Sequence, residues 1–285
     1  MQTDPYTLFQ PSERETCVVF ASPHSGRAYD WSFLQNSILD ERTIRSSEDA
    51  YVDMLFGSVP QYGAPLLAAN APRAYVDLNR GAEELDPALV SGVRRQALNA
   101  RISSGLGVIP RVVAGARPIY RGKISMAEAQ HRLNTIWFPY HNRLKQVLTQ
   151  SQQMFGQAVL IDCHSMPHEA VRSTTRNGVR PEIVLGDRHG ASASQEVVDQ
   201  VAEAFRDAGF VVARNAPFAG AFITQHYGRP TRNQHVVQVE IDRSLYMNES
   251  LIRPNGQFNT VQARLEKVVA RICQMGRDQR QLAAE

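Results

Sequence analysis

The stretch that most constrains the fold is AVLIDCHSMP, residues 158–167. Its apolar start predicts a buried strand over Ala158–Cys163, with His164 just beyond the strand at its C-terminal edge. Ligands of open α/β sheets bind at that edge. A second apolar run, Cys17–Ala21, predicts another strand, and His24 follows it closely. The sequence therefore predicts two strand-end histidines that lie far apart in the chain.

Apolar runs alternate with helical patterns along the rest of the chain, which predicts an α/β fold. We expect one domain over residues 1–285, with a mixed, mostly parallel central sheet and helices on both of its faces. Residues 1–15 are expected to form a surface lead-in, and 82–122 an irregular segment that covers a site. The expected strands are Cys17–Ala21, Pro65–Ala69, Ala74–Leu78, Ala158–Cys163, Glu182–Leu185, Phe210–Ala213 and Val236–Ile241. The expected helices are 46–59, Met126–Phe155 (capped by Ser125 and split near Pro139), Ser192–Ala208 and Phe258–Leu282, with a loop at Pro217–Pro230.

Composition narrows the class of protein. A hydrophobic content of 43% and a charged content of 21% are typical of a globular chain. The net charge is only +3, and the basic residues are scattered, which argues against nucleic acid as a partner. Three cysteines without a CxxC pair indicate neither a disulfide framework nor a cysteine zinc site. With no secretory leader or membrane span expected, we predict a cytoplasmic monomer or homodimer that acts on a small molecule.

The two strand-end histidines suggest a metal site. A hydrolytic zinc takes about three protein ligands and a water, so a carboxylate must join His24 and His164. Asp49 is the best candidate, with Glu48 beside it as the alternative. Asp49 has an equally good structural explanation, because a carboxylate in the first turn of the helix at 46–59 would cap that helix. The residues alone leave both explanations open.

Glu240 lies inside an otherwise apolar strand, in HVVQVEID. A buried carboxylate is costly unless it is paired or functional. We expect it to act as a general base, and the alternative is a buried salt bridge to an arginine.

Several polar residues in short loops are candidates for binding an anionic substrate. Arg73, Asn79, Arg80 and Arg121 have the chemistry that holds a carboxylate, although most arginines simply lie at the surface. His226 would bind substrate or polarise a carbonyl, or else be an ordinary packing or surface histidine.

Nucleophilic catalysis is a weaker alternative. The sequence has no Gly-x-Ser-x-Gly elbow, no Walker loop and no Gly-x-Gly-x-x-Gly fingerprint. Cys163 adjoins His164, but neighbouring residues of a strand point to opposite faces.

Several blocks together resemble the N-formylglutamate amidohydrolase family. They are SPHSG at 22–26, the segment of Asp49 ending in MLF, YVDLNR at 75–80, PIYR at 118–121, WFPYH at 137–141, IDCHSMP at 161–167, FITQHYG at 222–228, VQVEI at 237–241 and LYMNE at 245–249. The resemblance implies a fold like that of the zinc carboxypeptidases and aspartoacylases. It also implies hydrolysis of N-formyl-L-glutamate to formate and L-glutamate, as in histidine catabolism.

The resemblance further implies roles for individual residues. Zinc, or another divalent metal, would be held by His24, Asp49 and His164, and Glu240 would be the base. Substrate carboxylates would be held by Asn79, Arg80 and Arg121. Two alternatives remain open: a deacylase of another N-acyl amino acid or small peptide, and a non-catalytic binder of acidic metabolites.

Overall fold

The structure is a computed structural model that describes residues 4–94, 99–172 and 180–282. Contacts within the chain group it into two compact units. The first contains Met1–Thr7, Pro23–Ala50 and Ala68–Arg143, and the second contains Leu8–Ser22, Tyr51–Leu67 and Leu144–Glu285. The expectation of one domain over 1–285 stays a prediction.

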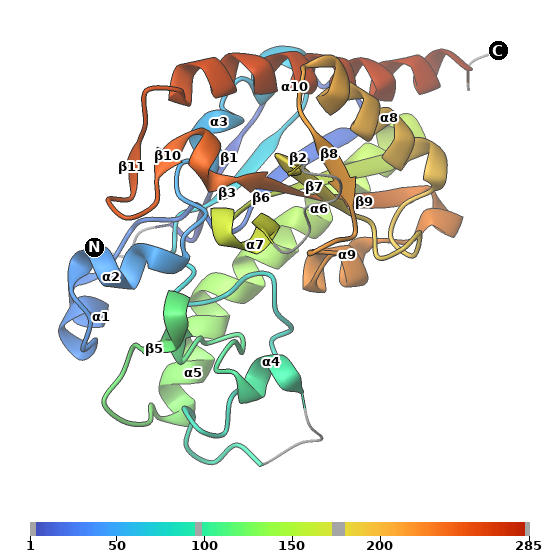
Figure 1. Ribbon diagram of the computed structural model, residues 1–285. Helices are drawn as coiled ribbons and strands as arrows, with labels where there is room; N and C mark the ends of the chain where they lie inside the picture. The colour runs from blue at the N-terminus through green and yellow to red at the C-terminus, as the bar shows by residue number, and fades with distance from the viewer. Residues whose placement is uncertain (1–3, 95–98, 173–179, 283–285) are drawn as a thin grey trace. The chain divides into compact units, whose positions relative to one another are not determined.

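A seven-stranded sheet has the order β1-β3-β2-β6-β9-β7-β8 (Figure 1). Its strands are β1 Tyr6–Phe9, β2 Val18–Ser22, β3 Leu66–Ala69, β6 Ala158–Met166, β7 Ile183–Gly186, β8 Val212–Arg214 and β9 Gln234–Asp242. β6 pairs in parallel with both β2 and β9, and β7 pairs in parallel with β8 but antiparallel with β9. The predicted mixed, mostly parallel sheet is therefore confirmed. Two short pairs lie outside it: β4 Val112–Val113 with β5 Arg117–Pro118, and β10 Met247–Asn248 with β11 Arg253–Pro254.

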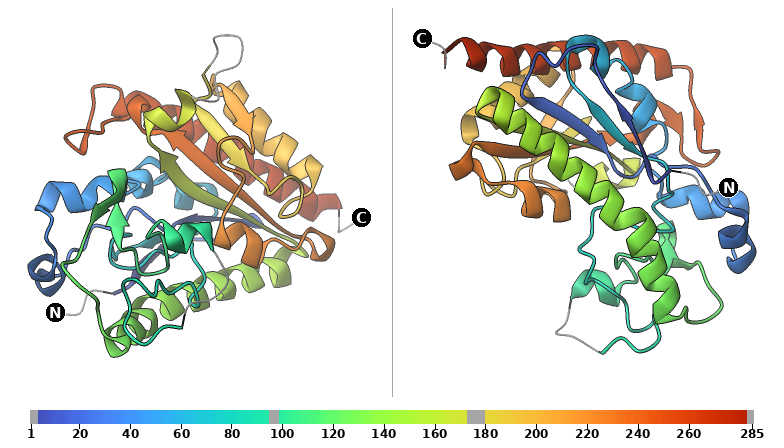
Figure 2. Two further views of the ribbon diagram at one scale, coloured as in Figure 1. Left: turned by 60° about the horizontal axis from the view of Figure 1, so that its bottom comes forward. Right: turned by 180° about the vertical axis from the view of Figure 1, so that it is seen from behind.

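The α-helices are α1 Trp31–Asn36, α2 Glu41–Ile44, α3 Val52–Leu55, α4 Ala100–Ser103, α5 Met126–Arg132, α6 Phe138–Phe155, α7 His168–Arg172, α8 Gln195–Asp207, α9 Phe222–Tyr227 and α10 Phe258–Leu282. In the second unit, α8 and α10 lie together on one face of the sheet, and the C-terminal half of α6 lies on the other (Figures 1 and 2). All nine residues of β6 and eight of the nine in β9 are buried. The helices on both faces keep these central strands buried.

Serine caps fix two helix starts. The Ser125 side chain accepts the backbone N–H of Glu128, and the side chain of Ser194 does the same for Val197. The predicted split of the helix over Met126–Phe155 is confirmed, because a π-helical turn at Leu133–Trp137 separates α5 from α6. Pro139 has no backbone N–H to donate to the preceding turn, which explains the irregularity just before it.

The first unit has its own small core. Phe33, Ile44, Ala74, Val113 and Ile119 pack together there. The Arg132 guanidinium lies against this core, 4.1 Å from the centre of the Tyr75 ring, and its Nε donates to Glu128 Oε1 at 2.7 Å.

Two predicted elements were wrong. The surface lead-in expected at residues 1–15 stays a prediction, and β1 within it joins the sheet. Ala74–Leu78 forms turns rather than a strand. Residues 46–59 do not form one helix: Tyr51 has a left-handed φ of 67°, and α3 begins only after it. Such a backbone conformation interrupts a right-handed helix.

Two further predicted segments differ from the structure. β6 continues through His164 to Met166, so this histidine lies within the strand and not beyond it. The segment 217–230 was expected to be a loop, but it contains α9. Residues 82–122 are largely irregular where described, and 95–98 lie outside the described residues. That this segment covers a site stays a prediction. No helix among the described ranges is both long and apolar enough to cross a bilayer.

Candidate active site and metal centre

Two adjacent parallel strands place four polar side chains on one face of the sheet. In the register of β6 and β9, Asp162 is opposite Gln238 and His164 is opposite Glu240. Residues two apart on a strand share a face, so the four form a compact block. All four are buried, and the Gln238 amide Nε2 donates to Glu240 Oε1 at 2.9 Å.

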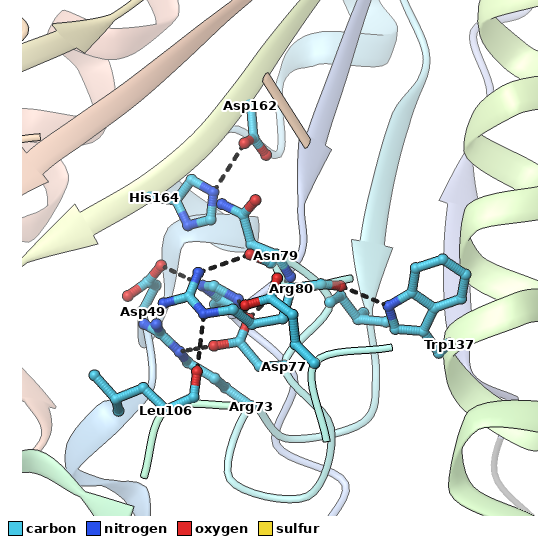
Figure 3. Close-up of polar contacts among 12 residues, drawn as sticks. Asp49, Arg73, Asp77, Asn79, Arg80, Leu106, Trp137, Asp162 and His164 are labelled. Atoms are coloured by element: carbon cyan, nitrogen blue, oxygen red, sulfur yellow. Dashed lines mark hydrogen bonds and ion pairs between the residues drawn. The ribbon is translucent and has the colours of Figure 1, made fainter. Parts of the chain in front are cut away.

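His164 has a carboxylate partner on its own strand. Its Nε2 lies 3.1 Å from Asp162 Oδ2 (Figure 3). Asp162 is 0% exposed, and His164 is the one ion-pair partner that it has among the described residues. A buried carboxylate is costly unless a positive charge or a hydrogen-bond donor lies close to it.

His24 has the same arrangement from a different part of the chain. It follows β2, which pairs with β6 from Val18 to Ala21. The His24 Nε2 lies 2.7 Å from Asp77 Oδ1, and its Nδ1 lies 3.3 Å from Asp49 Oδ2.

Asp77 is held by several donors. Its Oδ1 accepts the backbone N–H of Asn79 at 2.9 Å, and its Oδ2 accepts Arg73 Nε at 3.1 Å (Figure 3). Burial opposes ionisation of Asp77, but Arg73, His24 and Arg80 outweigh it and hold its pKa well below the usual range. Asp77 is therefore an anion that fixes the ring of His24.

Asp49 joins His24 through the backbone as well. Its N–H donates to the carbonyl of His24 at 3.0 Å. Asp49 precedes α3 by three positions, so it is not in the first turn of a helix, and the capping explanation is removed. The neighbouring Glu48 already has partners. Its carboxylate accepts hydrogen bonds from Nε and Nη2 of Arg45 at 3.0 and 3.1 Å and from the Tyr29 hydroxyl at 2.7 Å.

His24, Asp49 and His164 each offer one ligand atom, and these atoms lie within 4.8 Å of one another. All three residues are buried. Two imidazole nitrogens and one carboxylate oxygen are a donor set that zinc accepts, with a coordination position left for water or substrate. One nitrogen of each ring also lies near an aspartate, since Nε2 of His24 is 2.7 Å from Asp77 and Nε2 of His164 is 3.1 Å from Asp162. The residues therefore fit a divalent metal.

The Asn79–Arg80 turn is fixed by the helix that follows it in the first unit. His141 Nε2 lies 3.0 Å from the carbonyl of Leu78, and Trp137 Nε1 donates to the carbonyl of Arg80 at 2.9 Å. Arg80 is 7% exposed. Its Nε donates to the carbonyl of Leu106 at 3.0 Å, and its Nη1 donates to that of Asn79 at 2.7 Å (Figure 3). Nη2 has no hydrogen-bond partner among the described residues.

The other predicted substrate-binding residues are placed differently. Arg73 is engaged by Asp77, as described above. Arg121 is exposed and lines a surface depression together with Ser37, Lys123 and Glu128. His226 is exposed on α9 and stacks on Phe222, with ring centres 4.9 Å apart. Roles for these residues in substrate binding stay predictions.

Cys163 lacks the properties of a nucleophile. Burial, reinforced by Asp162, raises the pKa of its thiol well above the ordinary value. Its Sγ faces the carbonyl of Ile161 at 3.5 Å, on the side of the strand opposite His164. Burial also raises the pKa of the other two thiols, to about 11 for Cys17 and about 12 for Cys273.

Sequence reasoning missed three residues of this site. Asp162 and Gln238 stand two positions before a predicted site residue on the same strand, and that spacing alone places them on its face. Asp77 gave no comparable signal, because its segment was taken for a strand.

The profile of the N-formylglutamate amidohydrolase family matches residues 16–247. The N-formylglutamate deformylase of Pseudomonas aeruginosa is 30% identical over 244 residues, which cover 81% of this chain and 82% of the relative. That of Pseudomonas putida is 27% identical over 240 residues, 82% of each chain. The crystal structure of N-formylglutamate amidohydrolase from Ralstonia eutropha is similar with a TM-score of 0.90 and 35% identity, over 97% of this chain and 99% of that one. A gene product of Agrobacterium tumefaciens shares the fold, with a TM-score of 0.66 at 15% identity over 96% of each chain. The chain thus belongs to the N-formylglutamate amidohydrolase family.

Proposed function

We propose that this protein hydrolyses N-formyl-L-glutamate to formate and L-glutamate, with a divalent metal, zinc first, held by His24, Asp49 and His164. One observation carries the proposal: the parallel register sets Glu240 beside His164 on a buried sheet face. A carboxylate next to a metal-ligating histidine is where a general base for hydrolysis belongs.

The metal, when bound, would polarise the formyl oxygen and make a water molecule more acidic at neutral pH. Asp77 and Asp162 would keep the proton on the Nε2 atoms of His24 and His164, so that both Nδ1 atoms can act as ligands. These aspartates have a positioning role and do not contact the substrate.

Glu240 would accept the proton of the attacking water on Oε2. Its other oxygen is held by Gln238 at 2.9 Å, which fixes the orientation of the carboxylate. Oε2 would then pass the proton to the leaving nitrogen, so that Glu240 ends the cycle ionised.

Asn79 and Arg80 would bind a carboxylate of the substrate. The turn is rigid because Trp137 and His141 hold its carbonyls, and Arg80 keeps Nη2 for a ligand. A fixed guanidinium positions the carbonyl carbon of the substrate as well as binding it.

A formate-release assay joined to metal analysis tests the proposal. We expect formate from N-formyl-L-glutamate, about one metal ion per chain, and loss of activity on chelation that zinc restores. Release of formate from chelated, metal-free protein would contradict the metal role. A panel of formylated and acetylated amino acids tests the alternative of another N-acyl substrate, which would be preferred over N-formyl-L-glutamate.

A further inference from the structure

A second histidine–carboxylate pair lies one step beyond the proposed base. On β9, Asp242 follows Glu240 on the same face of the strand, since alternate residues share a face. The register that pairs Glu240 with His164 pairs Asp242 with Met166. Asp242 is therefore at the end of the strand, next along the sheet face from Glu240.

His168 opens α7, directly after β6 (Figure 1). Its Nδ1 lies 2.7 Å from Asp242 Oδ2, and its backbone N–H donates to Glu249 Oε1 at 3.0 Å. The other oxygen of Asp242 accepts the N–H of Ser244 at 2.9 Å. The side chain of Asp242 is 6% exposed and that of His168 is 30% exposed. The imidazole is thus anchored on a buried carboxylate and extends toward solvent.

This cluster is not a serine triad. Ser244 Oγ lies 3.1 Å from Nδ1 of His168, the same nitrogen that meets Asp242. In a triad the serine and the carboxylate contact different ring nitrogens. Nε2 of His168 has no hydrogen-bond or ion-pair partner within the described ranges, and the side chain is 30% exposed.

The chemistry of Nε2 identifies the group that it would bind. With Asp242 placed to accept from Nδ1, the ring would carry a proton there, and a ring with a proton on both nitrogens would donate from Nε2 as well. A donor with positive charge pairs well with a carboxylate. N-formyl-L-glutamate has two carboxylates, and the proposed function assigns one of them to Arg80. Arg121, expected to bind the other, lines an exposed depression with Ser37 and Lys123.

We propose that His168, positioned by Asp242, binds the second carboxylate of the substrate and makes the enzyme selective for acidic over neutral side chains. This inference rests on the proposed function, because it assigns a substrate contact within that same site.

The test compares N-formyl-L-glutamate with N-formyl-L-glutamine, which has the same shape but lacks the side-chain charge. We expect His168→Ala to lower kcat/KM for the glutamate substrate about 10- to 100-fold, mainly through KM, because a charge-assisted hydrogen bond is lost. For the glutamine substrate the change should stay below about threefold. Asp242→Asn should reduce the preference in the same direction, and His168→Gln, which retains the size and a neutral donor, should be intermediate.

His131→Ala is the matched control, since His131 is an exposed histidine on α5, and its preference should equal that of the wild type. Metal content should be unchanged in every variant. Equal losses on both substrates, or an unchanged preference in His168→Ala and His168→Gln, would overturn the inference.

Calorimetry with N-acetyl-L-glutamate and N-acetyl-L-glutamine separates this inference from the proposed function. If the wild type releases no formate but binds N-acetyl-L-glutamate more tightly than N-acetyl-L-glutamine, and His168→Ala removes this preference, the proposed reaction is contradicted and the binding role is supported. A wild type that shows neither turnover nor this preference would overturn both.

Discussion

Asp162→Asn gives the sharpest test of how the proposed metal centre is held. The substitution keeps the size of a side chain that is completely buried and 3.1 Å from His164 Nε2, but it removes the charge. Loss of such a partner typically weakens metal binding about 10- to 100-fold. That range corresponds to about 1.4–2.7 kcal/mol of metal binding free energy.

Two measurements follow from this magnitude. Competition with a chromophoric chelator should show the weaker zinc affinity directly. Calorimetric melting should show that zinc in fixed excess raises Tm by about 2–5 °C less in the variant than in the wild type, because metal-linked stabilisation follows the dissociation constant. Asp199→Asn is the control, since Asp199 is half exposed and pairs with Arg214 on the surface. If Asp162→Asn binds zinc as tightly as the wild type, Asp162 does not orient His164 and the reasoning fails.

Four further outcomes are expected. Glu240→Gln should lower formate release by at least about 100-fold while zinc content, measured by elemental analysis, stays at the wild-type level. Gln238→Leu should lower kcat about tenfold with little change in KM, because Glu240 loses the donor that orients it. A rise in KM of about tenfold would contradict this role. Cys163→Ala should retain activity, and iodoacetamide should not inactivate the wild type, because burial keeps this thiol protonated. Burial lowers the pKa of His235, whose Nδ1 accepts the N–H of Ser194. The unfolded chain therefore binds more protons below about pH 6.5, so stability against urea should fall as pH drops through that value, and less steeply in His235→Asn.

The site residues that can be predicted from the sequence are those whose placement follows from the alternation of side chains along a strand. His164 and Glu240 stand out because each interrupts an apolar run, and a buried polar group in a strand needs a reason. Asp162 and Gln238 were within reach of the same argument, since an Asp-x-His or Gln-x-Glu spacing on a strand fixes which side chains share a face.

The remainder depends on contacts between distant segments. Alternation in AYVDL suggested a strand over Ala74–Leu78, but this segment is held instead by side chains of α5 and α6, such as Arg132 on the Tyr75 carbonyl at 3.4 Å. The helix expected at 46–59 is interrupted at Tyr51, where the backbone takes a left-handed conformation that local propensity disfavours. Asp49 is held by a backbone hydrogen bond with His24, and no sequence pattern predicts such a bond.

The residues proposed to carry out hydrolysis and those proposed to recognise the substrate are held in place in different ways. Glu240 and His164 are aligned by the backbone ladder of two buried strands, so their spacing does not depend on any loop. The residues proposed to recognise the substrate lie on turns and strand ends: Arg80 on a turn fixed by Trp137, and His168 at a helix start fixed by Asp242. Changes to these anchors should therefore alter which N-acyl amino acid is accepted before they alter the hydrolytic step itself. The order is testable in one series, because Asp242→Asn should shift the ratio of kcat/KM values between substrates, whereas Gln238→Leu should lower kcat for all of them alike.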